Sequence, residues 1–239
     1  MNLPMRGRRV VAVAGRAAML LAVVVVVPAC APRTKIRART APVPLAGSEW
    51  PRPEVLGAAM RAWECGRQQG DFDSSLLTVV DYSLPSTERR LWVIDVLAHR
   101  VVNYEFVAHG RGSGENQAMS FSNEPGSLQS SLGLFRTEDT YFGGEGYSLR
   151  LRGLEPGVND RAMERRIVVH GADYVSPGMI AEHGRLGRSW GCLALSRDVA
   201  STVIDRIKGG SAVFAYYPDP WWMQTSQFLR CDGSLMARR

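Results

Sequence analysis

The sequence predicts a mainly β domain with a few peripheral helices. Short runs of β-branched and aromatic residues recur between turn residues, as the strands of a β-rich fold do. These runs do not alternate regularly with helical segments, so a parallel α/β sheet is not expected. After residue 53 the chain has about 185 residues, which is enough to bury one hydrophobic core. We therefore expect a single folded domain over residues 54–239.

Two helices are expected at the edges of this domain. The first runs along residues 54–69, where apolar residues recur at helical spacing. The second is expected over residues 197–208, because Ser196 can cap its start and two glycines follow its end. The apolar stripe of the first helix consists of Val55, Ala59, Met60 and Trp63.

The predicted strands are the apolar runs that lie between turn residues. Two of them, 91–97 and 101–109, are separated by a short polar turn and are expected to form a hairpin. The glycine-rich stretch 143–146 marks another turn. The full set of expected strands is 76–82, 91–97, 101–109, 131–136, 147–151, 167–170 and 211–216.

Residues 1–29 have the pattern of an export signal. Four arginines precede the apolar run 17–27, and small residues follow it before Cys30. The run is shorter than the about 20 apolar residues that cross a membrane. Residues 27–30 resemble a bacterial lipobox, which would make Cys30 the lipidated first residue of the mature chain. Cleavage by the ordinary signal peptidase and an uncleaved anchor are the alternatives. We expect a cell-envelope or periplasmic protein, anchored to the membrane through Cys30.

The excess of positive charge lies in the leader and in the tether that follows it. The whole chain has 29 Lys and Arg residues against 23 Asp and Glu residues. The tether, residues 30–53, is rich in proline and arginine and reads as an extended linker. From residue 49 onward 21 basic residues face 23 acidic ones, which gives 21 − 23 = −2. Nucleic acid is therefore not an expected partner.

The cysteines allow one disulfide in the domain. If Cys30 is lipidated and Cys192 stays a thiol, Cys65 and Cys231 remain. Paired cysteines oxidise outside the cytoplasm, and this pair would join the two ends of the domain. The alternative is two free, buried cysteines that act as small apolar residues.

Cys192 and His170 are the candidate catalytic pair. Cys192 follows a turn that contains Gly191, and His170 ends an apolar run. A thiol becomes a nucleophile when a base or a cation lies close to it. Gly191 permits unusual backbone angles, so that N–H groups can face a developing oxyanion. Ser189 can hold this turn through a hydrogen bond to the backbone.

Other residues near this pair are candidates for substrate contact. Gly171 leaves space beside His170, and Arg188 can meet a substrate carboxylate. Trp190 can form a wall of the pocket, and His109 can line the same cleft. For each of them a structural role in a turn, in packing or in solvent is the alternative. The histidines at 109, 170 and 183 and Cys192 do not have the spacing of a compact zinc motif, so no metal is expected.

The catalytic region resembles that of the murein L,D-transpeptidases, which have the YkuD-like fold. That family has a His-Gly pair, a spacer and then Ser/Thr-His-Gly-Cys. This chain has His170-Gly171 and then Ser189-Trp190-Gly191-Cys192, so tryptophan replaces the usual histidine. Longer phrases of the family appear in order over residues 75–217, among them 91–95, 130–133 and 187–192.

The resemblance implies a β-sandwich or barrel with Cys192 as nucleophile and His170 as general base. Backbone amides around Gly191 would form the oxyanion hole, and Ser131 would lie in a substrate-positioning turn. The implied activity is an exported L,D-transpeptidase that acts on peptidoglycan stem peptides through a thioester, needs no cofactor and is acylated by carbapenem-type β-lactams. An L,D-carboxypeptidase with the same site is one alternative. A non-catalytic, lipid-anchored cell-wall-binding protein is another, because Trp190 and the residues after Cys192 depart from the family pattern.

Overall fold

The computed structural model describes residues 50–231, which form four α-helices, eight strands and one short 3-10 helix. None of the helices within this range is long and apolar enough to cross a membrane. The predicted leader, the tether up to residue 49 and Cys30 lie outside the described residues. The helices are α1 (Pro53–Gln69), α2 (Pro177–His183), α3 (Arg197–Ile207) and α4 (Pro220–Thr225). The strands are β1 (Leu76–Asp81), β2 (Leu91–Asp95), β3 (Arg100–Glu105), β4 (Gly133–Gly143), β5 (Gly146–Gly153), β6 (Val168–Ala172), β7 (Leu193–Ser196) and β8 (Ala212–Tyr216).

All eight strands belong to one mixed sheet in the order β3-β2-β1-β8-β4-β5-β6-β7. The pairs β1–β8 and β6–β7 are parallel, and the other neighbours are antiparallel. The chain that follows β3, one edge strand, bridges to β7, the other edge strand, through Ala108 and Ala194. The sheet therefore curls until its two edges meet one segment, and the predicted mainly β fold is confirmed.

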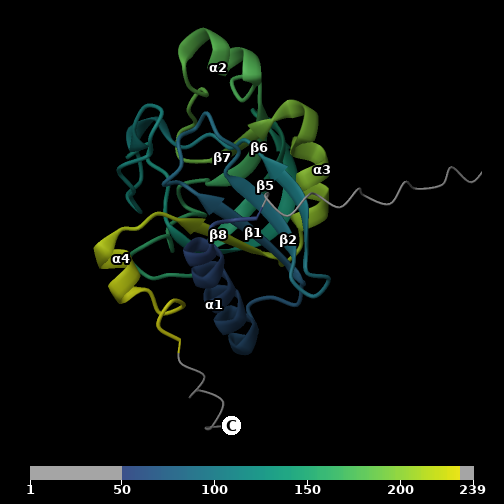
Figure 1. Cartoon of the computed structure of the whole chain (residues 1–239), viewed down its shortest axis with the longest axis vertical. Helices are drawn as coiled ribbons and strands as arrows, with labels where there is room; N and C mark the ends of the chain where they lie inside the picture. Colours follow the sequence, from purple (N-terminus) through teal and green to yellow (C-terminus); the bar gives the residue numbers. More distant parts are fainter. Residues whose placement is uncertain (1–49, 232–239) are drawn as a thin grey trace, which may run out of the picture. The chain divides into compact units, whose positions relative to one another are not determined.

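Helices α1 and α3 pack on this curved sheet, whereas α2 lies at the top of the view in Figure 1. Helix α1 packs against β8 and β1, and α3 packs against β6. The predicted apolar stripe of α1 is confirmed, because Val55, Ala59 and Trp63 are buried and Met60 packs against the core. The largest apolar side chains of that core come from the sheet and the C-terminal segment, and they include Phe135, Phe214, Trp222 and Phe228.

Several element boundaries differ from the expectation. Strand β3 ends at Glu105, because the chain beyond it leaves β2 and turns toward β7. Strand β4 runs to Gly143, seven residues past the expected end, and forms a long hairpin with β5. The second half of β4 is half-buried or exposed and has no continuous apolar run, so its sequence did not predict a strand. Helices α2 and α4 were not predicted.

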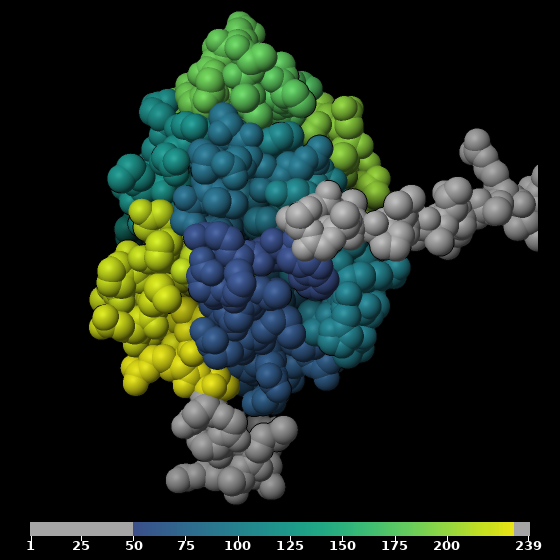
Figure 2. Space-filling model, in the orientation of Figure 1, coloured from purple at the N-terminus to yellow at the C-terminus, as the bar shows by residue number. Residues whose placement is uncertain are grey.

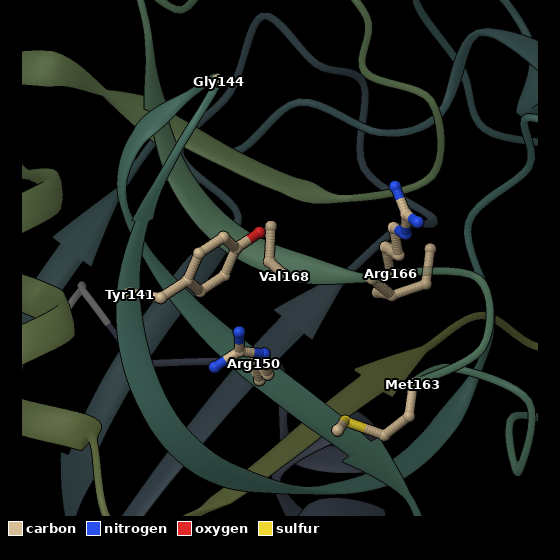
Figure 3. A pocket seen from close by; sticks show the side chains of 7 residues that line it. Tyr141, Gly144, Arg150, Met163, Arg166 and Val168 are labelled. Carbon is tan, nitrogen blue, oxygen red and sulfur yellow. The ribbon is translucent and has the colours of Figure 1, made fainter.

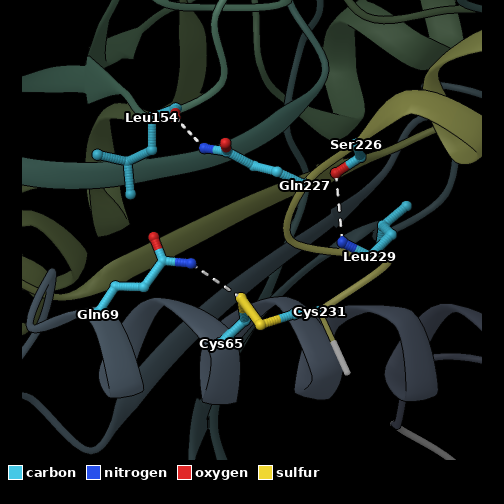
Figure 4. Close-up of a disulfide and its surroundings, with 7 residues drawn as sticks. All are labelled: Cys65, Gln69, Leu154, Ser226, Gln227, Leu229 and Cys231. Carbon is cyan, nitrogen blue, oxygen red and sulfur yellow. Dashed lines mark hydrogen bonds between the residues drawn. A yellow bond between two sulfur atoms is a disulfide. The ribbon is translucent and has the colours of Figure 1, made fainter. Parts of the chain in front are cut away.

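The predicted disulfide is present and joins Cys65 of α1 to Cys231 (Figure 4). The two Cα atoms are 5.9 Å apart, and 166 positions separate the residues in the sequence. On the face shown in Figure 2, the C-terminal segment after β8 lies beside α1. A loop of this length corresponds to a nominal stabilisation of about 5 kcal/mol in the chain-entropy model.

Candidate active site

His170 and Cys192 belong to two neighbouring parallel segments of the sheet. His170 lies in β6 and pairs in register with Ala194 of β7. Cys192 lies two positions before Ala194, at the entry to β7. Cys192 itself lies in the bend that leads into β7, directly before Leu193, which pairs with Val169 of β6. Cys192 is the free cysteine among residues 50–231.

The turn before Cys192 depends on glycine and on Ser189. Gly191 has a φ of +119°, and a Cβ there would lie 2.7 Å from the Gln129 carbonyl oxygen. The Ser189 hydroxyl donates to the Cys192 carbonyl at 2.7 Å and accepts from the Gly191 N–H at 3.1 Å. The prediction that Ser189 holds the turn is confirmed. The Gly191 N–H, predicted to face an oxyanion, is already engaged within the turn.

The segment 109–111 holds this turn through backbone hydrogen bonds. The Ser189 N–H donates to the His109 carbonyl, and the Arg111 N–H donates to the Ser189 carbonyl. The Gly110 N–H donates to the Ser130 hydroxyl at 3.0 Å. A Cβ at Gly110 would lie 2.9 Å from the Gly191 Cα, so the two turns are in close contact. The position of the sulfur is therefore set by packing as well as by its own strand.

The sulfur of Cys192 lies against the start of β6. Its Sγ is 3.6 Å from the Arg166 carbonyl oxygen, within reach of a weak S–H···O hydrogen bond. Burial raises the pKa of the Cys192 thiol, while the Val168 N–H and the Arg165 guanidinium act in the opposite direction. At neutral pH the resting group is the thiol.

His170 is buried and held by one ring nitrogen. Its Nδ1 lies 3.1 Å from the Gly171 carbonyl oxygen and 3.8 Å from the Glu145 carboxylate. Both neighbours are acceptors, so the proton of the neutral ring lies on Nδ1 and the lone pair on Nε2. Burial lowers the pKa of His170, and the Gly171 carbonyl and Glu145 partly oppose that shift.

Arg165 belongs to the site although the sequence did not single it out. Its guanidinium donates to the carbonyl oxygens of Ser122 and Gln129 and to the Ser131 hydroxyl. It also lies 3.3 Å from where a Cβ of Gly191 would be. Arg165 thus holds the segment 122–131 beside the turn and brings a positive charge toward Cys192. Local sequence did not indicate this role, because the hydrogen-bond partners of Arg165 lie 34 to 43 positions away in the chain.

A pocket of about 460 Å³ lies beside the segment that contacts the sulfur, although neither Cys192 nor His170 lines it. Residues 166–168 line this pocket, and the carbonyl oxygen of Arg166 is the atom that contacts Cys192 Sγ. In Figure 3 Tyr141 and Arg150 lie on one side of the pocket, and Met163 and Arg166 lie on the other. Gly144, at the tip of the β4–β5 hairpin, completes the lining together with Ile167 and Val168.

Most of the predicted substrate-contacting residues have structural partners. Gly171 faces α3, where a Cβ would lie 3.1 Å from the Ala200 Cβ, so its small size admits the helix. Ser131 is buried and donates to the Ser122 carbonyl at 2.9 Å. Arg188 pairs with Glu115 at 2.6 Å. Trp190 is 72% exposed, so its indole does not pack into the core.

His109 lies in the interior and not in the wall of a cleft, which corrects its predicted position. Only 1% of its surface is exposed. Its Nδ1 is 2.7 Å from the guanidinium of Arg90, which is itself fully buried and also donates to the Val107 carbonyl. Because the segment 107–110 closes the curled sheet, its side chains face the core. His109 supports the loop that holds Ser189.

The burial of His109 predicts a loss of stability in mild acid. Burial, with Arg90 as the next cause, lowers the pKa of His109 to about 4, against about 6.5 in an unfolded chain. The unfolded state therefore binds a proton that the folded state excludes between these two values. Stability from this residue is complete above pH 6.5, and about 2 kcal/mol of it is lost at pH 5.

Urea unfolding at pH 7 and pH 5 measures this effect. In His109→Gln the difference between the two free energies of unfolding should shrink by about 2 kcal/mol relative to the unsubstituted chain, because the titrating group is gone. An equal difference in both proteins would show that His109 is protonated in the folded state.

The structure does not assemble a metal site from the four residues considered above. Within residues 50–231 no cluster of three or more His, Cys, Asp or Glu side chains is placed to hold a metal ion. His183 ends the short helix α2 and has an exposed side chain that lies near Glu182.

The chain is similar to known proteins in one family model and in several solved structures. The family model, described as the L,D-transpeptidase catalytic domain, matches residues 49–216. An L,D-transpeptidase from Mycobacterium smegmatis has 16% sequence identity and a TM-score of 0.37, with 60% of this chain and 59% of that chain covered. An L,D-transpeptidase from Stackebrandtia nassauensis has 13% identity and a TM-score of 0.37, with 69% and 67% covered.

A third similar structure is that of the L,D-transpeptidase LdtMt1 in complex with imipenem. It has 16% identity and a TM-score of 0.36, and 59% of each chain is covered. This chain therefore spans about three fifths of the length of the first of these structures. No curated protein sequence matches the chain.

Proposed function

The chain belongs to the L,D-transpeptidase catalytic domain family, and we propose that it transfers peptidoglycan stem peptides through a thioester on Cys192. One observation carries this proposal above the others. His170 lies in β6 and Cys192 directly before the neighbouring parallel strand β7, and the segment that contacts the sulfur also lines a pocket. A nucleophile and a base held on rigid elements are what acyl transfer requires.

The two side chains start the reaction as a neutral pair. Burial disfavours the thiolate of Cys192 and the imidazolium of His170, so both shifts favour thiol and imidazole over the ion pair. His170 accepts the thiol proton at Nε2 while the sulfur attacks the substrate carbonyl. The Gly171 carbonyl holds the proton already on Nδ1 and thereby fixes the ring orientation.

The proposed substrate bond joins the L-centre of a diamino acid to the following D-alanine. The C–S bond forms as the carbonyl becomes an oxyanion, for which the Cys192 N–H is the proposed donor, since the Gly191 N–H already donates to Ser189. The oxyanion collapses, the C–N bond breaks, and His170 returns its proton to the amine of D-alanine. A second stem's amine then takes the acyl group and yields a cross-link. If water takes it, the product is that of an L,D-carboxypeptidase.

We place this activity in the cell envelope, where the substrate lies. The disulfide between Cys65 and Cys231 is in keeping with an oxidising compartment. Lipidation of Cys30 would hold the domain at a membrane surface, with the tether as spacer. Carbapenem-type β-lactams are the proposed covalent inhibitors, because they present a reactive carbonyl to the same thiol.

Intact-mass spectrometry of the chain with a tetrapeptide stem tests the proposal. We expect a covalent adduct with the mass of the stem minus D-alanine, together with free D-alanine in solution. A sample with Cys192 alkylated beforehand serves as the blank. D-alanine release without an adduct, and with equal rates in the blank, would contradict a thioester route.

The exposed indole of Trp190 favours one further candidate, a non-catalytic wall-binding protein. A tryptophan that is 72% exposed beside the turn can stack on a sugar or a peptide without any chemistry. In that case the chain would sediment with purified peptidoglycan, Trp190→Ala would release it, and no adduct would form on Cys192.

A further inference from the structure

The pocket beside the sulfur carries two guanidinium groups. Arg150 of β5 lies opposite Val168 of β6, and cross-strand partners point to the same face of a sheet. Tyr141 of β4 reaches that face as well, because its partner Ser148 lies opposite His170. The pocket is therefore an extension of the face that holds His170.

Arg166 is placed there by an uncommon backbone conformation. Its φ is +56°, a value that asparagine and glycine adopt more easily than arginine does. The same residue directs its carbonyl toward Cys192 Sγ and its side chain into the lining of the pocket. Within residues 50–231 its guanidinium has no hydrogen-bond or ion-pair partner.

The guanidinium of Arg150 is held in the pocket by two neighbouring side chains. Its guanidinium lies 4.1 Å from the centre of the Tyr141 ring and pairs with the exposed carboxylate of Asp139. Asp139 balances this charge, so the free positive charge of the pocket comes from Arg166. A second carboxylate near the pocket is that of Glu145, which follows the lining residue Gly144 and lies near His170.

We infer that Arg166 and Arg150 form a carboxylate-binding subsite next to the reacting thiol. A guanidinium matches a carboxylate with two parallel hydrogen bonds, and a partly enclosed pocket strengthens that pairing. The identity of the ligand rests on the proposed function. A stem tetrapeptide offers two suitable groups near the scissile bond, which are the carboxylate of the leaving D-alanine and the free carboxylate of the diamino acid.

Alkylation of Cys192 tests the subsite without any reference to peptide substrates. Iodoacetate and iodoacetamide both form a C–S bond and release iodide, but only the first carries a carboxylate. The rate at Cys192 is followed by peptide mass mapping of the full chain. The ratio of the two rates cancels any change in the thiolate fraction. We expect Arg166→Met to lower the iodoacetate-to-iodoacetamide ratio about tenfold, and Arg150→Met to lower it as well.

Arg111→Met is the matched control, because this exposed arginine lies near the turn and outside the pocket. It should leave the ratio at the value of the unsubstituted chain. A ratio that does not change in Arg166→Met, or that falls equally in Arg111→Met, overturns the subsite.

Amidated peptides then identify which carboxylate is bound. We compare kcat/KM of the unsubstituted chain and Arg166→Met on stems with a C-terminal carboxamide or with an amidated diamino acid. Arg166→Met should cost about tenfold on the free acid and little on the stem that lacks the bound carboxylate. An equal loss on every stem contradicts substrate recognition by Arg166. If no stem reacts while the alkylation ratio still falls, the subsite stands and the proposed function fails.

Discussion

Under the proposed mechanism, replacing Cys192 with alanine should abolish both the thioester and the release of D-alanine, and should lower turnover by a factor on the order of 10⁵ to 10⁶. No other side chain can take its place, because the sulfur is the free thiol among residues 50–231 and sits at the entry of β7. The partly buried side chain loses one atom, so the free energy of unfolding should change by no more than about 1 kcal/mol.

Intact mass with a stem tetrapeptide and a coupled assay for D-alanine measure the first effect. Thermal unfolding measures the change in stability and shows whether Cys192→Ala is still folded. Arg111→Met provides a comparison, because this exposed side chain lies near the turn and takes no part in the chemistry. Turnover that persists in Cys192→Ala would move the reaction to another group and disprove the mechanism.

Replacing His170 with alanine should lower kcat/KM on a stem peptide by about 10² to 10⁴, the usual contribution of a general base. The loss is large here because burial keeps Cys192 protonated at neutral pH, so the sulfur depends on a base for its attack. Burial also lowers the pKa of His170, so the acid limb of the pH–rate profile should lie below about 6.5 in the unsubstituted chain.

The dependence on pH separates a base from a merely structural histidine. At a pH above the pKa of the thiol, Cys192 is a thiolate and reacts with iodoacetamide without help. The alkylation rates of His170→Ala and the unsubstituted chain should then converge, although peptide turnover stays low. A gap that persists at high pH would assign His170 to the packing of β6 instead.

The sequence predicted the parts of the fold that leave a local signal. Strands with continuous apolar runs, such as β1, β2 and β8, were found, and so were the long helices α1 and α3. Helices α2 and α4 have only seven and six residues, too few for an apolar period. Their capping signals were nevertheless present, since Ser176 and Asp219 each precede a proline and each accept the N–H three residues later.

The candidate site was predicted only in its centre. Cys192, His170 and the turn at Ser189 follow from local sequence. Arg165 and Glu145 do not, because the hairpin β4–β5 and the loop before β6 bring them to the site through sheet order. For His109 the sequence left a cleft role and a structural role open, and the structural role holds, because closure of the sheet turns the side chain inward beside Arg90.

The disulfide between α1 and Cys231 has a consequence for how the domain is made. Cys231 lies 166 positions after Cys65 and beyond β8, so the bond can form only after all eight strands have been synthesised. A truncated product therefore lacks the partner that secures the first helix and keeps Cys65 as a thiol. The cross-link therefore forms only in a chain that contains every strand of the sheet, and a thiol at Cys65 distinguishes a fragment that lacks Cys231.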